Sequence, residues 1–284
     1  MMSTPADLSY PEDPDVPEVP PRSRIVVALD SSNQSLAALK AAAELAALMQ
    51  AELQGMFVED IDLIRLSGLP FTYEIGSYSA TRRRLDSGAV ERDFRLMAQQ
   101  MRRAVAQTAV TARVTWSFQV TRGSVTNELL AAAEAAEILT LGRVGRTPGR
   151  RLGSTAKMIM HRAMRPVFLL SDEGLTYPLI VLHIGTPASD RALTLAATLV
   201  HGRADGLALA VVADPAHDGD ERDLRAKRLG DELDADEVAH ELFLVDDAAQ
   251  LALFLAERAT GTLVLPSDLA DLLETLSRSA ILVP

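Results

Sequence analysis

The chain has 284 residues, of which 48% are apolar and 24% are charged, and its formal net charge is −11. This length exceeds that of one typical domain, and the apolar content is sufficient for two cores. The absence of cysteine excludes disulfides and thiolate metal sites, and the acidic balance, with no aromatic residues interleaved among the arginines, argues against nucleic acid as a partner.

Residues 1–23 are predicted to form a disordered, proline-rich acidic tail. Six prolines fall within the first 21 residues, and the tail has five acidic residues against one arginine, a composition that cannot bury a core. The tail lacks the basic start and apolar middle of a secretory signal, and no run of about 18 uncharged apolar residues follows it. We therefore expect a cytoplasmic protein that does not enter a membrane.

An internal repeat begins at residue 24. Residues 24–60 align without a gap with residues 178–214, at an offset of 154. Each copy opens with a short apolar run typical of a buried strand, passes through a turn into an alanine- and leucine-rich helix, and ends in a second strand. The repeat therefore predicts two parallel β-α-β units.

Each copy continues as a five-stranded α/β domain. Hydrophobic periodicity predicts, in the first copy, helices at 91–109, 125–136 and 155–163 and strands at 113–120, 137–141 and 166–170. In the second copy it predicts helices at 221–233, 247–259 and 268–276 and strands at 238–245, 262–265 and 280–283. The predicted fold class is α/β, with two tandem domains, 24–171 and 172–284, that each hold a five-stranded parallel sheet of the Rossmann-like type. Their net charges are +6 and −13.

Residues 61–90 are inserted between the second strand and the second helix of the first copy only. Loops of this length within compact domains usually serve as lids, binding segments or disordered connections. Because the loop is rich in apolar and aromatic residues, we expect it to pack against either the ligand cleft of the first domain or the second domain. These residues are Leu69, Phe71, Tyr73, Ile75 and Tyr78.

A loop rich in glycine and arginine, "LGRVGRTPGRRLGST" at residues 141–155, distinguishes the two copies. The strands on either side of it align between the copies at offsets of 124 and 114, so the second copy lacks about ten residues there. The same alignments replace Gly142 with Pro266, and Asp30, after the first strand, with Ile184. The acidic residue and the loop are therefore lost together.

The end of the first strand and the glycine loop are predicted to form one ligand crevice. Ligands of parallel α/β sheets bind beyond the carboxyl ends of the strands at the topological switch point, where Asp30 and Gly142 are expected to meet. Glycine lets the backbone approach phosphate oxygens, and the start of a helix at Gly153 and Ser154 favours an anion. A carboxylate suits ribose hydroxyls or an exocyclic amine, and arginines add charge-assisted hydrogen bonds. The arginines of the loop are Arg143, Arg146, Arg150 and Arg151.

The sequence resembles the universal stress protein (UspA-like) family over residues 24–284, as a tandem member of this Rossmann-like (HUP) fold. The resemblance rests on "RIVVALDSS" at residues 24–32 and on the glycine loop with the helix and strand that follow it. In ATP-binding members the loop reads G-x2-G-x9-G-[ST] and holds the phosphates, the strand-end Asp lies near the nucleoside, and the end of the second strand meets adenine. The resemblance implies that the nucleotide-binding residues are Asp30, Val58, Gly142, Gly145, Gly153 and Ser154.

This chain departs from the family pattern in the length of the loop. The spacing here is G-x2-G-x7-G-S, two residues short, with Pro148 and Gly149 inside the loop. We therefore expect ATP or another adenine nucleotide as the ligand, bound in the first domain only, with a reshaped phosphate path and with Arg143 and Arg146 as additional contacts. The second domain is then a degenerate copy of a stress-response regulatory protein.

Two other functions remain open. One is a ligand-free interaction or scaffold protein of the same fold, and the other is a slow nucleotide-processing enzyme that depends on the inserted loop. The chain has no G-x-S-x-G elbow and no Walker A motif, so it offers no catalytic residue and at most slow ATP hydrolysis is expected. Its five histidines lack metal-ligand spacing, so no metal site is predicted.

The resemblance also implies how the two domains meet. The family pairs domains through their closing strands, which here are residues 167–170 and 281–283. Pairing these strands within one chain would bury both sheet edges. A homodimer of the whole chain is a further possible assembly.

Overall fold

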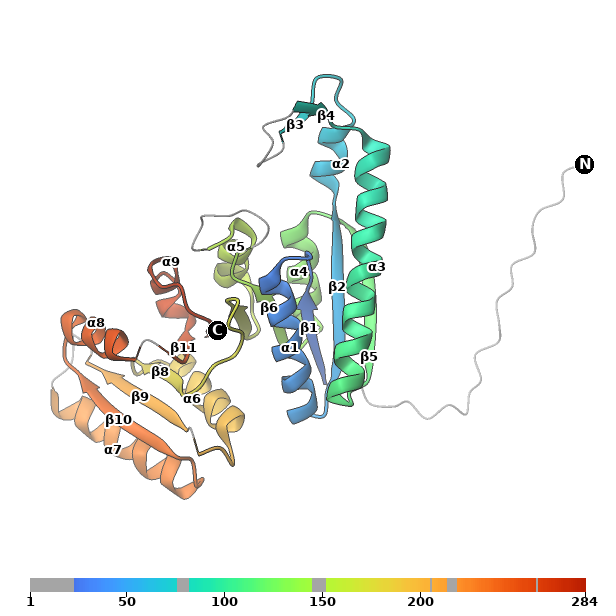
Figure 1. The fold of residues 1–284 in the computed structure, drawn as a ribbon. Helices are drawn as coiled ribbons and strands as arrows, with labels where there is room; N and C mark the ends of the chain where they lie inside the picture. Colours follow the sequence, from blue (N-terminus) through green and yellow to red (C-terminus); the bar gives the residue numbers. More distant parts are fainter. Residues whose placement is uncertain (1–22, 76–81, 145–151, 205, 214–218, 259) are drawn as a thin grey trace, which may run out of the picture.

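The computed structural model describes residues 23–75, 82–144, 152–204, 206–213, 219–258 and 260–284. Within these residues, ten strands form one sheet in the order β10-β9-β8-β11-β12-β7-β6-β1-β2-β5 (Figure 1). The strands of the first half are β1 (Arg24–Ala28), β2 (Glu52–Asp60), β5 (Trp116–Gly123), β6 (Ile138–Gly142) and β7 (Val167–Leu170). Those of the second half are β8 (Leu179–His183), β9 (Leu207–Val212), β10 (His240–Val245), β11 (Thr262–Pro266) and β12 (Ala280–Val283).

Both halves of the sheet have the same strand order. In the first half β1 pairs in parallel with β2 on one side and with β6 on the other. In the second half β8 pairs in parallel with β9 and β11 in the same way. The predicted α/β class with a largely parallel sheet is confirmed, and each half has its topological switch point beside its first strand.

The two halves join through an antiparallel pair of strands, β7 and β12. Phe168 lies opposite Ile281, with Val167 opposite Leu282 on one side and Leu169 opposite Ala280 on the other. Phe168 and Ile281 are fully buried. Neither closing strand is therefore a free edge, and the outer edges of the sheet are β5 and β10.

Helices cover both faces of the sheet, and each face has a core that runs through both halves. One core contains buried residues of α1 (Asn33–Leu48), α3 (Ser87–Ala112), α6 (Pro187–Val200) and α7 (Gly219–Ala235). The other contains buried residues of α4 (Val125–Glu134), α5 (Ser154–Arg162), α8 (Ala248–Glu257) and α9 (Leu272–Thr275). Among the described residues, no helix combines the length and the apolar character needed to cross a bilayer.

Side-chain caps explain why several of these helices begin where they do. Ser32 accepts a hydrogen bond from the backbone N–H of Ser35 at the start of α1. Asp86 caps α3 in the same way, Thr186 caps α6, and Asp247 caps α8. Such caps satisfy N–H groups that have no partner within the helix, which stabilises each start by about 1 kcal/mol.

One predicted helix of the second half is broken. The pattern at 268–276 predicts one continuous helix, whereas the chain forms a 3₁₀ turn at Ser267–Leu269 and the short α9. The connection from β11 to β12 lacks the residues of the first copy's glycine loop, so the chain has to turn as soon as β11 ends. The periodicity predicts the buried face correctly, since Ala270 and Leu273 are in the core.

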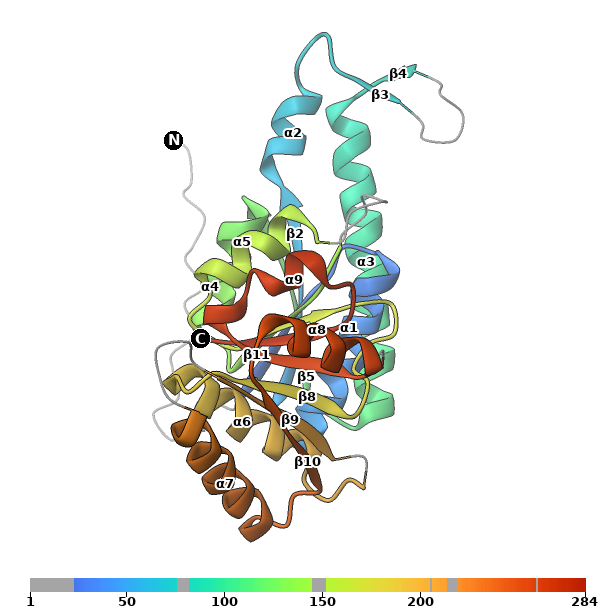
Figure 2. The ribbon, with the colours of Figure 1, turned by 90° about the vertical axis from the view of Figure 1, so that its left-hand side faces the viewer.

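The prediction that residues 61–90 form a loop is wrong. They contain helix α2 (Ile61–Ser67), strands β3 (Tyr73–Ile75) and β4 (Arg82–Arg84), and the start of α3. In Figures 1 and 2 these elements lie beyond the end of the sheet, beside the start of α3 and away from the second half. We call the segment 61–86 the insert.

The apolar residues of the insert whose side chains the structure describes do not pack as predicted. Leu69, Phe71 and Tyr73 are exposed, Phe71 to 86%. Tyr78 and the side chain of Ile75 lie outside the part of the chain that the structure describes. The insert is anchored instead through Ser67, which is buried, and through Ile64 and Leu85, which pack against the core that includes α3. The described part of the insert therefore rests on the first half.

Candidate functional site

A cavity of about 330 Å³ lies at the carboxyl ends of β1, β2 and β6. It occupies the topological switch point of the first half, where strand order predicts a ligand crevice. The end of β1 and the start of α1 form one wall, the end of β2 and helix α3 form another, and the start of α5 closes it. The residues around it include Ala28, Asp30, Met56, Val58, Asp60, Phe94, Met97, Val125, Gly142, Gly153, Ser154 and Thr155.

The structure brings the described part of the predicted site together. Asp30, Val58, Gly142, Gly153 and Ser154 all line this cavity although they come from separate strands, loops and a helix. Arg143 also lines it. The remaining two predicted residues, Gly145 and Arg146, lie outside the described residues.

A tight turn after β1 holds Asp30 at the cavity. Its Oδ1 atom accepts hydrogen bonds from the backbone N–H of Ser32 at 3.0 Å and from the Ser32 hydroxyl at 2.6 Å. Ser31, between them, has a left-handed backbone with φ of 64°, a conformation that residues other than glycine, Asn and Asp seldom adopt. The carboxylate is thus fixed at the strand end before any ligand arrives.

Gly142 ends β6 directly against the start of α1. A Cβ atom at this position would lie 2.9 Å from the Cβ of Gln34 and 3.2 Å from the backbone nitrogen of Ser35. The side-chain oxygen of Gln34 accepts a 2.7 Å hydrogen bond from the backbone N–H of Val144. Glycine is needed here for close packing of strand against helix, and this contact positions the first residues of the glycine loop.

The start of α5 faces the cavity with backbone donors. Gly153 is the N-cap residue, and no side chain of the described residues caps the helix. The Gly153 N–H itself bonds to the carbonyl of Arg143 at 2.8 Å, which closes the base of the loop. The N–H groups of Ser154 and Thr155 belong to the first turn, where the helix dipole favours an anion.

The guanidinium of Arg143 reaches the second half of the chain. Arg143 is 1% exposed, and its Nη2 atom donates hydrogen bonds to the carbonyl oxygens of Leu273, at 2.7 Å, and Leu276, at 2.5 Å, in the second half. Burial lowers the pKa of Arg143 to about 10, so the group stays charged at neutral pH. Arg143 thus forms a contact between the two halves, and its contact with a phosphate stays a prediction.

Two cavity residues, Phe94 and Met97, have no motif that marks them in the sequence. They lie on consecutive turns of α3, and Phe94 packs edge-on against Phe57 of β2. The sulfur of Met97 accepts a hydrogen bond from the Ser31 hydroxyl at 3.6 Å. Helical periodicity predicts that this face of α3 is buried, but only the tertiary structure places these two residues at the cavity.

The second half fills the corresponding space with an arginine. The carbonyl of Val212, which aligns with Val58 in the internal repeat, accepts a 2.7 Å hydrogen bond from Nη2 of Arg225. Gly185, in the turn after β8, has a left-handed φ of 85°, and a Cβ atom there would clash with the same guanidinium. The guanidinium thus lies between the ends of β8 and β9, where the first half is open.

The ends of α3 and α7 identify the first-half counterpart of Arg225. The N–H of Val114 bonds to the carbonyl of Ala109 after α3, and the N–H of Val238 bonds to the carbonyl of Leu233 after α7. The residues eight positions before these carbonyls are Met101 in α3 and Arg225 in α7. A buried methionine in one half therefore corresponds to a charged side chain in the other.

A buried histidine closes the same region of the second half. The Nε2 atom of His183 lies 3.0 Å from Oδ1 of Asp190, and its Nδ1 atom accepts the backbone N–H of Gly185 at 3.3 Å. Burial, partly opposed by the hydrogen bond to Asp190, lowers the pKa of His183, and Arg225 and Arg228 lower it further. The imidazole is therefore neutral at pH 7, with its Nε2 proton donated to Asp190.

The strand order and the position of the cavity define the class of doubly wound α/β proteins with a crevice at the switch point. A sequence profile of the Universal stress protein family matches residues 21–171. This match covers more than half of the chain, and the chain belongs to the universal stress protein family. No curated protein matches the sequence.

Solved structures of universal stress proteins have the same fold. One from Archaeoglobus fulgidus DSM 4304 aligns with a TM-score of 0.67 and 14% identity, over 92% of this chain and 97% of that one. One from Pseudomonas aeruginosa UCBPP-PA14 aligns with a TM-score of 0.53 and 12% identity, over 92% and 93%. A universal stress protein solved in complex with cAMP aligns with a TM-score of 0.39 and 21% identity, over 54% and 99%. At these identities the first two alignments establish the shared fold across both halves.

Proposed function

We propose that the chain is a regulatory protein that binds ATP or another adenine nucleotide in the first-half cavity. The second half, 172–284, is then a ligand-free copy that stabilises the first. The observation that carries this proposal is the contrast between the halves: a cavity with a fixed carboxylate and an uncapped helix start in one, and an arginine in the same space in the other.

The lining of the cavity suits each part of a nucleotide. Phe94, Met97 and Val58 offer apolar surface for a purine ring, which packs well against aromatic and thioether groups. The carboxylate of Asp30 can accept hydrogen bonds from ribose hydroxyls. The N–H groups of Ser154 and Thr155 can donate to a phosphate, with the helix dipole adding to the attraction.

Among its described residues, the second half lacks each of these features. Ile184 stands where Asp30 stands, so no carboxylate is offered to a ribose. The guanidinium of Arg225 already bonds to the Val212 carbonyl, so the backbone contact for a base is occupied. Proline at position 266 ends β11, and the glycine loop is missing. The domain boundaries at 23/24 and 171/172 belong to this proposal, with the β7–β12 pair as the built-in partner contact.

Calorimetric titration of the full-length chain with ATP, ADP and AMP tests the proposal, together with mass analysis of nucleotide released from the purified protein. We expect one site for each chain. Asp30→Ala should weaken binding by about tenfold or more, since a hydrogen bond to a charged group contributes about 1.5–3 kcal/mol. Gly142 is unsuitable for this test because any side chain there would displace α1.

Two variants contrast the halves. Met97→Arg places a guanidinium at the cavity and should abolish binding. Arg225→Met removes a guanidinium from the second half, at a distance from the cavity, and should leave binding unchanged. Wild-type protein that carries no nucleotide and ignores added ATP would instead support the scaffold function. Multiple turnover that disappears when the insert is removed would support the enzyme.

A further inference from the structure

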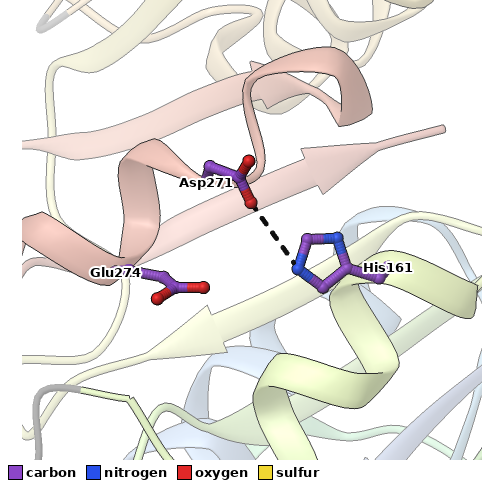
Figure 3. Close-up of side chains that lie close together, drawn as sticks. All are labelled: His161, Asp271 and Glu274. Atoms are coloured by element: carbon purple, nitrogen blue, oxygen red, sulfur yellow. Dashed lines mark ion pairs between the residues drawn. The ribbon is translucent and has the colours of Figure 1, made fainter.

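Three side chains capable of binding a metal ion meet between α5 and α9. His161 lies in the last turn of α5, Asp271 is the residue before α9, and Glu274 lies within it (Figure 3). Nε2 of His161 is 3.7 Å from Oδ1 of Asp271, and one ligand atom from each of the three residues lies within 4.8 Å of the others. All three are exposed to solvent.

The fold brings these residues together from the two halves of the chain. Helices α5 and α9 each precede a closing strand, and those strands, β7 and β12, are paired side by side. Both helices cover the same face of the sheet, so their exposed sides meet above the junction. The histidine and the carboxylates are separated by more than 100 residues in the sequence. Spacing along the chain therefore does not predict this cluster.

The chemistry of the cluster favours a transition-metal ion. One imidazole nitrogen and two carboxylate oxygens are ligands of zinc-class ions, whereas calcium and magnesium prefer oxygen ligands alone. Bonds of about 2.1 Å in tetrahedral geometry place ligand atoms about 3.4 Å apart. The observed separations are wider by at most about 1.4 Å, a difference that rotation of exposed side chains can close.

Lys157 forms an ion pair with one of the three residues of this cluster. Nζ of Lys157 lies 2.6 Å from Oε1 of Glu274 and comes from α5, one turn before His161. Two carboxylates thus face one ammonium group and one imidazole, and a divalent ion would compete with the ammonium for Glu274. Loss of Lys157 should therefore favour metal binding, an effect opposite to that of losing a ligand.

We propose that His161, Asp271 and Glu274 form a binding site for a zinc-class divalent metal ion that links α5 to α9. Solvent completes the coordination, because all three side chains are exposed. The ion would join the helix whose first residues line the first-half cavity to the second half of the chain. This site is independent of the nucleotide proposal.

Calorimetric titration of the untagged full-length chain with zinc chloride tests the site, with cobalt absorption spectra to report the ligand geometry. We expect saturable binding, with one zinc ion for each chain at the site of highest affinity. His161→Gln and Glu274→Gln should each weaken that binding by at least about tenfold. Removal of a group that only hydrogen-bonds to a metal ligand can already cause a loss of this size. Lys157→Gln should strengthen it.

His201→Gln is the matched control, since it removes another exposed histidine, at the end of α6, and should leave zinc affinity unchanged. The urea midpoint of each variant verifies folding, and little change is expected at these exposed positions. Absence of saturable binding in the wild type overturns the proposal, as does wild-type affinity in His161→Gln. Weaker binding in Lys157→Gln would also overturn it, because the lysine would then not be a competitor.

Discussion

Asp30 and Arg143 illustrate how differently two predicted site residues can be used. Asp30 accepts two hydrogen bonds within its own turn, so the local sequence is sufficient to position it. The Arg143 guanidinium, next to a cavity residue, contacts carbonyl groups more than 120 residues away. A guanidinium that the sequence predicts to bind an anion can equally donate hydrogen bonds to buried carbonyl groups. Only the path of the second half determines which of the two partners is within reach.

His183 makes the stability of the protein depend on pH. Its folded pKa is lowered, chiefly by burial, so above the unfolded value of about 6.5 both states are neutral at this residue. As the pH falls below about 6.5 the unfolded state takes up a proton first, and stability is lost until the folded pKa is reached. The loss has a maximum slope of about 1.4 kcal/mol for each pH unit.

The measurement is the free energy of unfolding in urea at pH 7.5 and at pH 5.5. His183→Leu introduces the side chain found at the aligned position of the first half, Leu29, and should reduce the difference between the two pH values. An equal difference in wild type and variant would mean that another group is responsible for the acid sensitivity.

At the scale of elements, truncating a side chain should lower the free energy of unfolding more in the central strands than in the edge strands. The closing strands β7 and β12 are buried along their whole length and hold the two halves together. The outer strands β5 and β10 have one open edge each, and their side chains are more exposed. The cost of truncating a side chain rises with the apolar surface that it buries and with the volume of the cavity that truncation creates.

We expect Phe168→Ala to lower the free energy of unfolding by about 3–5 kcal/mol, the usual cost of removing a buried phenylalanine. Phe168 is fully buried opposite Ile281 at the junction. Val120→Ala, in the edge strand β5 where the side chain is 45% exposed, serves as the control and should change stability much less. Denaturant unfolding compares them, and similar losses would contradict this account of the junction.

At the scale of the whole molecule, the chain forms one continuous sheet with two cores that cross its midpoint. The first half on its own would expose the β7 edge and would leave the Arg143 guanidinium without the carbonyls of Leu273 and Leu276. An unpaired apolar strand edge promotes association with another chain. The second half thus completes the first even without a ligand.

A fragment of residues 23–171 is therefore expected to self-associate. Light scattering after size-exclusion chromatography should give a mass above that of one fragment. Addition of residues 172–284 as a separate chain should reduce this association, because β12 can then cover β7. A stable monomeric fragment with the same unfolding free energy as the full chain would contradict the prediction.

The sequence by itself determined the α/β class, the repeat of two five-stranded units and the approximate bounds of most strands and helices. These follow from local periodicity, from caps such as Ser32, and from the 154-residue offset that aligns Asp30 with Ile184. It also predicted that Asp30, Gly142, Gly153 and Ser154 lie at one crevice, because strand ends at a switch point converge. Val58 followed from the family resemblance, and all five residues line the cavity.

The tertiary structure alone decided what depends on contacts between distant segments. It turned the guanidinium of Arg143 to the second half, placed Arg225 against Val212, and brought His161 to Asp271. It also gave the insert a helix and a hairpin with Phe71 exposed. The physical reason is that side-chain orientation and long-range packing are set by the relative positions of whole elements, which neither hydrophobic periodicity nor spacing along the chain encodes.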